Sequence, residues 1–246
     1  MMEPLTIEAI SAMDADTVAR HLAGPPAERA SFVLVAAQAG IAEAQAIYGQ
    51  MLLDGSGIAA DPQAALGWFA KAAQQQHVMA INMVGRCYDL GWGVGVDKAR
   101  AAEWYKAAAD RGLDWAMYNL ATLMTLGEGV AEDRPAALAL FRKAAAMGNA
   151  KAMNFIGSFY EDGWVVEYDL DSAASWYEKA AIGGDFRGQF NHARLLADRG
   201  RIDEAVAWLR RVPETATDAF LGKARDLLAR SPIAAMRDAA AILVRD

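Results

Sequence analysis

The 246-residue chain has little of what most catalytic, secreted or membrane proteins carry: one cysteine, Cys87, and three histidines. A single cysteine excludes an intramolecular disulfide. The first residues lack a basic segment followed by an apolar run, so we expect no signal peptide. No apolar stretch reaches the roughly 18 residues that a membrane-spanning helix needs. These absences predict a cytoplasmic protein without a membrane partner, in a reducing compartment that suits a free thiol.

Positive charge is also scarce. The chain has 24 Lys and Arg residues against 31 Asp and Glu, a net charge of −7. Non-specific binding to nucleic acids needs a basic field that displaces counterions from phosphates, so we expect no nucleic-acid partner. The hydrophobic fraction of 54% is enough to build a sizeable core.

What the sequence does have is an internal repeat with a strict period of 36 residues. The recurring columns are Gly55, Gly91, Gly127 and Gly163; Gly57, Gly93 and Gly129, with Val165 in the fourth copy; Asp61, Asp97, Asp133 and Asp169; Ala65, Ala101, Ala137 and Ala173; Trp68, Trp104, Leu140 and Trp176, each followed by an aromatic residue; and Ala44, Ala80, Ala116 and Ala152. Chance does not hold six columns in register over four copies, and such periodicity indicates a repeat architecture.

Each copy predicts two helices. In the first full copy, small and apolar residues recur on one face of a helix over about 43–53. The Gly-x-Gly turn ends that helix, because glycine reaches left-handed dihedral angles at low cost. The second helix begins near Asp61, a good N-cap acceptor, with Pro62 in the first helical position.

The second copy is the most complete, with Ala80, Gly85, Tyr88, Gly91, Gly93, Val94, Asp97, Ala101, Trp104, Ala107, Ala108 and Gly112. This pattern resembles the Sel-one-like repeat family, a relative of the tetratricopeptide repeat. The resemblance covers about residues 40–185. It implies an all-α fold, a right-handed superhelix of helix–turn–helix repeats that forms an α/α solenoid.

The ends depart from the pattern. Residues 186–213 predict a shortened repeat, because the interval from Trp176 to Trp208 is 32 residues. Terminal units of solenoids cap an otherwise exposed core. We therefore predict N-terminal capping helices in 1–39, at about 6–21 and 26–37, and C-terminal capping helices in 214–246, at about 217–230 and 232–244. With four 36-residue repeats in 40–185, the chain 1–246 is predicted to form a single domain.

Candidate catalytic chemistry is weak. The glycine-rich segment 91–95 superficially suggests a phosphate loop, but it follows a helix and recurs as a repeat turn. His21, His77 and His192 lie in non-equivalent positions of the repeat, and His192 falls in an inward column, which is typical of a satisfied core histidine. Cys87 is interpreted as a small buried hydrophobic residue. The sequence therefore predicts no catalytic residues, no metal site and no cofactor.

Candidate binding residues come from columns that packing does not fix. In a superhelix of helix pairs, the first helices line the concave face. By analogy with tetratricopeptide units, the candidate partner-binding residues are Met79, Asn82, Arg86, Trp115, Tyr118, Lys151, Asn154, Arg187, Phe190 and Arg194. Interfaces favour Trp, Tyr and Arg, and an asparagine amide can bond an extended peptide backbone. We predict a groove centred on Trp115 and Tyr118; the alternative is a solvated face with some packing between repeats.

Trp92 and Trp164 form a possible secondary patch. Both lie between the turn residues of alternate copies. Exposed tryptophans at an edge would form a contact surface. The alternative is that each folds back over the helix of the next repeat.

The family resemblance implies a non-enzymatic scaffold or adaptor that binds a protein or peptide. Two alternatives stay open. One is the hydrolase-like, β-lactam-binding activity described for cysteine-rich relatives, although this chain lacks their paired cysteines. The other is a self-associating structural protein. We expect a monomer or weak self-association, and the alanine-rich composition looks bacterial.

Overall fold

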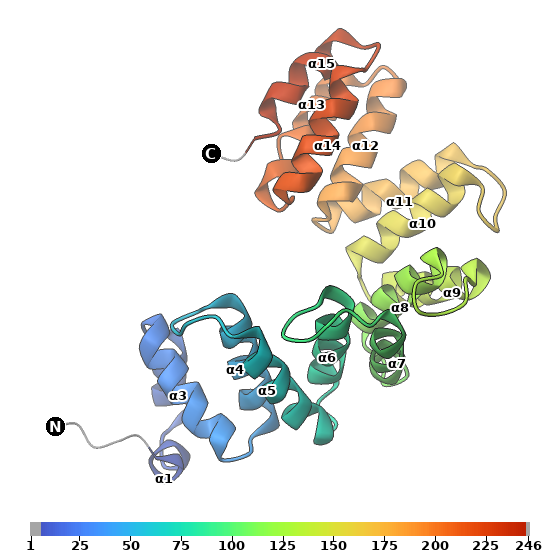
Figure 1. Cartoon of the computed structure of the whole chain (residues 1–246). Helices are drawn as coiled ribbons and strands as arrows, with labels where there is room; N and C mark the ends of the chain where they lie inside the picture. Colours follow the sequence, from blue (N-terminus) through green and yellow to red (C-terminus); the bar gives the residue numbers. More distant parts are fainter. Residues whose placement is uncertain (1–5, 245–246) are drawn as a thin grey trace. The chain divides into compact units, whose positions relative to one another are not determined.

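The structure is a computed structural model that describes residues 6–244 (Figure 1). All regular elements in this range are helical. They are α1 Ile7–Ser11, α2 Ala15–Ala23, α3 Pro26–Gln38, α4 Ala42–Asp54, α5 Pro62–Gln74, α6 Val78–Leu90, α7 Lys98–Ala109, α8 Asp114–Leu126, α9 Arg134–Ala146, α10 Ala150–Asp162, α11 Leu170–Ile182, α12 Phe186–Asp198, α13 Ile202–Leu209, α14 Asp218–Ala229 and α15 Ala234–Ala239, with short 3₁₀ turns η1 Val212–Glu214 and η2 Ala240–Ile242. The all-α prediction is confirmed. We call the first helix of each repeat (α4, α6, α8, α10, α12) an A helix and the second (α5, α7, α9, α11, α13) a B helix.

The repeat residues set the helix boundaries as predicted. The Asp61 carboxylate accepts a hydrogen bond from the backbone N–H of Ala64 at 2.9 Å, and Pro62 follows as the first residue of α5. The same aspartate column caps α7, α9 and α11. At the other end, Gly55 ends α4 in the left-handed region, with φ of 68°. Because these signals are local, the helix ends follow from sequence alone.

The second glycine of each turn has a different role. Gly93 has a φ of +71°, and a Cβ added there would collide with the carbonyl oxygen of Pro62, at the start of the preceding B helix. The turn therefore packs directly on that helix end, which only glycine permits. In the fourth copy Val165 adopts the same left-handed region, with φ of 54°. A β-branched residue rarely adopts this conformation, and local strain of this kind costs about 1–3 kcal/mol.

The described residues divide into two compact units, with the boundary between Glu132 and Asp133, in the loop between α8 and α9. In the first unit α4 packs on α5 and α6 packs on α7; in the second α10 packs on α11 and α12 packs on α13. The prediction of a single domain stays a prediction.

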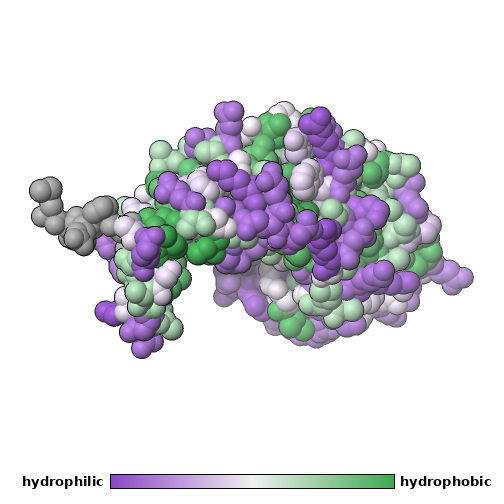
Figure 2. Space-filling view, turned by 90° about the horizontal axis from the view of Figure 1, so that it is seen from below, coloured by the Kyte–Doolittle hydropathy of each residue, from purple (hydrophilic) through white to green (hydrophobic). Residues whose placement is uncertain are grey.

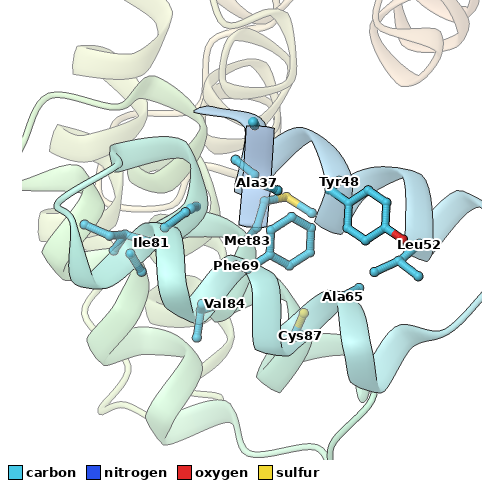
Figure 3. Packing of buried hydrophobic residues seen from close by; sticks show 14 of the residues in the cluster. Ala37, Tyr48, Leu52, Ala65, Phe69, Ile81, Met83, Val84 and Cys87 are labelled. Carbon is cyan, nitrogen blue, oxygen red and sulfur yellow. The ribbon is translucent and has the colours of Figure 1, made fainter. Parts of the chain in front are cut away.

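The core of the first unit gathers around the B-helix aromatic residue Phe69, which is buried (Figure 3). Tyr48 and Leu52 of α4 and Met83 and Cys87 of α6 belong to the same cluster. Alanines at the helix contacts, such as Ala65, are fully buried and let the helices approach closely. In the second unit a separate cluster joins α12, α13, α14 and α15.

The ends follow the predicted helices with one correction. The front segment 6–21 is not one helix, because Asp14 caps a new helix, α2, by accepting a hydrogen bond from the Thr17 N–H at 2.7 Å. Helices α3 and α14 agree with the predicted 26–37 and 217–230. The predicted last helix, 232–244, is limited to α15 and the 3₁₀ turn η2. The parts of the predicted capping segments at 1–5 and 245–246 lie outside the described residues.

Candidate partner-binding surface

Three of the candidate residues lie on two successive A helices of the first unit. Met79, in the first turn of α6, is 43% exposed, and Trp115, in the first turn of α8, is 41% exposed. The Tyr118 ring is half-buried and meets the Trp115 ring edge to face, with 6.4 Å between centroids. We call Met79, Trp115 and Tyr118 the α6–α8 surface.

Asn82 and Asn154 are not on a solvated face. Asn82 is only 2% exposed, and its side-chain carbonyl accepts a hydrogen bond from the Asn119 amide of α8 at 3.1 Å. Asn154 is likewise buried and accepts from Asn191 of α12 at 2.9 Å. Each pair joins two successive A helices. The candidate role of Asn82 and Asn154 in bonding a partner's backbone is therefore corrected, because a buried amide is bonded inside the protein.

The two candidate residues near the start of α12 both contact phenylalanine rings, but only one of them is buried. Phe190 is buried, and its ring lies edge to face with Phe220 of α14 at 5.7 Å between centroids. The Arg187 guanidinium lies over the Phe186 ring at 4.6 Å and remains exposed. Phe190 is thus removed from the set that a partner can touch, whereas Arg187 stays in it.

The turn tryptophans fold back within their own surroundings. The Arg86 guanidinium of α6 lies 4.7 Å from the centroid of Trp92, so two candidates from different sets stack on each other. Trp164 meets Phe159 of its own A helix edge to face at 5.6 Å and lies under Arg134 of the preceding B helix. Both tryptophans are half-buried. The two tryptophans therefore pack on their own repeat and on the preceding one. The alternative stated above, that each folds over the helix of the next repeat, is wrong.

The last of the basic candidates, Arg194, belongs to a hydrogen-bond network that the sequence reasoning missed. Its guanidinium bonds both oxygens of Glu161, at 2.5 and 2.7 Å. Glu161 also accepts a hydrogen bond from the Tyr177 hydroxyl at 2.7 Å. Burial raises the pKa of Tyr177, so the phenol stays protonated and donates.

An equivalent network stands two repeats earlier. The Tyr105 hydroxyl donates to Asp89 at 2.9 Å, and Lys98 bonds the same carboxylate and lies 3.2 Å from Glu128. Burial also raises the pKa of Tyr105. A signal for these networks exists in the sequence: the acid precedes the tyrosine by 16 residues in both copies, while the copies with Phe69 and Phe141 have no acid in that position.

Cys87 and His192 were both predicted to be buried core residues. Cys87 is fully buried, as predicted, and burial raises the pKa of its thiol to about 11. His192 is buried, but its ring makes no hydrogen bond to the described residues and only contacts Trp208 edge to face. His192 therefore lies in the core as predicted, and its nitrogens are not among the buried side-chain atoms of the described residues that lack a hydrogen-bond partner. Within residues 6–244, no group of three or more His, Cys, Asp and Glu residues is placed to hold a metal ion.

The remaining surface is mostly hydrophilic on the face that Figure 2 shows, where hydrophobic residues form small separate patches. No helix in the described range is long and apolar enough to cross a membrane. Of the ten candidates, Met79, Trp115, Tyr118, Lys151 and Arg187 keep some exposure.

The molecule is thus an all-α protein of stacked helix pairs whose residues recur in register. The family model for the Sel1 repeat matches residues 42–77, 78–113, 116–149 and 150–185. The chain belongs to the Sel1 repeat family, whose members generally act as protein–protein interaction scaffolds. No curated protein matches the chain.

Three solved structures with the same fold come from bacteria. A Sel1 repeat protein from Oxalobacter formigenes is 25% identical with a TM-score of 0.75, over 92% of this chain and 95% of that one. A protective antigen of uropathogenic Escherichia coli with an SLR fold is 26% identical with a TM-score of 0.66, over 93% of this chain. This chain spans 51% of that antigen. An immunity protein from Pseudomonas aeruginosa, 21% identical with a TM-score of 0.54 over 75% of this chain and 72% of that one, shares the fold.

Proposed function

We propose that the protein is a non-enzymatic scaffold that binds a protein or peptide partner through the α6–α8 surface. The observation that carries this proposal is the exposure of Met79 and Trp115, which occupy equivalent positions on two successive A helices. The Asn119–Asn82 hydrogen bond ties α6 to α8, so the three side chains are presented by a fixed pair of helices. Aromatic residues on rigid elements contribute most of the energy in many interfaces, because they bury large area at little cost in conformational entropy.

The rest of the candidate set has a smaller place in the proposal. Lys151 and Arg187 lie in the second unit and are equivalent in the repeat to Met79 and Trp115. The lone reduced and buried thiol of Cys87 favours action in the cytoplasm.

The test is a comparison of captured proteins. Immobilised protein carrying Met79→Ser and Trp115→Ser is compared by quantitative mass spectrometry with the unmodified protein. The matched control carries Val96→Ser and Leu126→Ser, which remove two apolar side chains of the same unit that are even more exposed. Loss of specific partners only from the first variant supports the proposal. Equal capture by both variants would remove the α6–α8 surface from consideration.

A further inference from the structure

The second unit contains a hollow that belongs to none of the features above. Its volume is about 230 Å³, and it lies between α11, α12 and the short turn that precedes α13. It is lined by Asp171, Ala174, Ser175, Glu178, His192, Leu195, Leu196, Arg199 and Arg201. Pockets for drug-sized ligands usually exceed about 300 Å³, so this space suits a single side chain or a small molecule.

Three lining residues of the hollow are smaller than their equivalents 36 residues earlier. Ala174 stands where the preceding repeat has Leu138, Leu195 where it has Phe159, and Leu196 where it has Tyr160. In that preceding repeat, Phe159 packs against Trp164 and Tyr160 bonds Arg142. The turn between the A and B helices is also four residues shorter in the fifth repeat than in the fourth. Only Arg199, Gly200 and Arg201 separate α12 from α13.

Polar residues replace apolar ones in the same wall. His192 and Ser175 occupy the positions of Ile156 and Ala139. His192 is only 8% exposed, yet its ring nitrogens make no hydrogen bond to the described residues. Burial lowers the pKa of this imidazole, so at neutral pH it is uncharged, with one nitrogen that accepts and one that donates. The ring nitrogens are not among the buried side-chain atoms of the described residues that lack a partner, so they reach the solvent of the hollow and can bond a ligand there.

The charges of the lining are unequally satisfied. Arg199 is paired with Asp171 at 2.5 Å, and Arg201 bonds both oxygens of Glu204 at 2.7 and 2.6 Å. The carboxylate of Glu178 makes no hydrogen bond or ion pair with the described residues. At the hollow, the Glu178 carboxylate and the Ser175 hydroxyl are exposed to solvent, and with an imidazole nitrogen of His192 they offer acceptors to a ligand.

We propose that this hollow binds the side chain of an arginine presented by a partner protein, with the guanidinium at Glu178, Ser175 and His192 and its aliphatic stem against Ala174 and Leu195. A guanidinium supplies five N–H donors in one rigid plane, whereas an ammonium has three donors around a compact charge, so the guanidinium reaches more acceptors and fixes their geometry. The net charge of −7 also favours a basic partner segment. The site is independent of the α6–α8 surface, because its residues all belong to the second unit.

The test uses short peptides, so that its failure and the failure of the scaffold proposal are distinguishable. Acetyl-Gly-Arg-Gly-amide is titrated into the full chain while the imidazole resonances are followed by NMR. The resonance of His192 is assigned with the His192→Ile variant. We expect a saturable shift of this resonance, a binding constant several-fold weaker for the lysine peptide, and no shift with the uncharged citrulline peptide.

Two variants locate the binding. Glu178→Gln is expected to weaken the arginine peptide about tenfold or more, because a hydrogen bond to a charged group is lost. Glu214→Gln, an exposed change in the same unit, is expected to leave binding unchanged. Leu196→Tyr restores the residue of the preceding repeat, fills the hollow and is expected to abolish binding while the circular dichroism spectrum is retained. Equal binding of the citrulline peptide, unchanged binding by Glu178→Gln, or a shift of His192 by acetate and not by the arginine peptide would each overturn the proposal.

Discussion

Gly157 provides a sharp test of the packing between A and B helices. It lies inside α10, where alanine is ordinarily the better residue by about 1 kcal/mol. A Cβ at this position would lie 2.5 Å from Cε1 and 2.6 Å from Cδ1 of Tyr177. The Tyr177 ring is buried, and its hydroxyl is bonded to Glu161, so it has little room to move away.

The expected sign follows from two opposing magnitudes. Overpacking of a well-packed core costs about 3 kcal/mol at the upper end, which exceeds the gain of about 1 kcal/mol in helix propensity. Gly157→Ala is therefore expected to destabilise the protein by about 2 kcal/mol. Gly85→Ala should act in the same direction, because a Cβ there would lie 2.7 Å from Cδ1 of Tyr105.

Gly222 is the matched control in the same unit. It lies inside α14, and a Cβ added there would meet no atom within 4 Å. Gly222→Ala is therefore expected to stabilise the protein by about 0.5–1 kcal/mol, the difference in helix propensity alone.

The assay is urea unfolding followed by far-ultraviolet circular dichroism. Midpoints are compared first, because repeat proteins do not always unfold in a single step. A fall in the midpoint for Gly157→Ala and a rise for Gly222→Ala agree with the reasoning. A rise for both variants would refute it, since it would mean that Tyr177 yields without cost.

Three further predictions concern single side chains. Tyr105→Phe is expected to cost about 1–2 kcal/mol in urea unfolding, because its hydroxyl bonds a carboxylate that retains only Lys98; an unchanged midpoint would contradict the network. The pKa of His192 is lowered in the folded protein, so stability should be lost as the pH falls below about 6.5 and through that lowered pKa. The His192→Ile variant should lack this part of the loss, and an identical pH profile of stability for the two proteins would contradict the prediction. Cys87, with its pKa of about 11 and no exposure, should react with a thiol reagent at pH 8 only as fast as the protein unfolds, and rapid stoichiometric labelling would contradict its burial.

The helix boundaries were predictable because their causes are local in the chain. Asp61 followed by Pro62 starts a helix, and Gly55 ends one, whatever the surrounding fold. The break at Asp14 has the same kind of cause. The sequence therefore carries a local signal that divides the segment 6–21 into two helices.

The interior polar residues were not predictable one column at a time. Asn82 looks like a surface residue until Asn119 of the next repeat is placed against it. Phe190 looks like an exposed aromatic until α14 covers it. In both cases the deciding partner lies on another element, and its identity depends on tertiary packing that the 36-residue period does not encode.

The pairs of a buried tyrosine and an acidic residue recur in every other copy of the repeat. Tyr105 and Tyr177 each require an acceptor, since a buried hydroxyl without one is costly, and Asp89 and Glu161 supply it. The first copy has phenylalanine in the tyrosine column and leucine in the acid column, so the two columns change together.

In the fifth, shortened repeat, a polar residue appears without a matching change in a second column. His192 enters an apolar column without any residue of the described chain bonding it, while the residues beside it become smaller. A cap that serves stability alone would fill such a space, because an unfilled hollow loses apolar contacts and so lowers stability. The hollow is therefore better explained by a ligand than by the end of the repeat. Leu196→Tyr separates the two explanations: filling the hollow should stabilise the protein in either case, but it should abolish binding of the arginine peptide only if the hollow is a binding site.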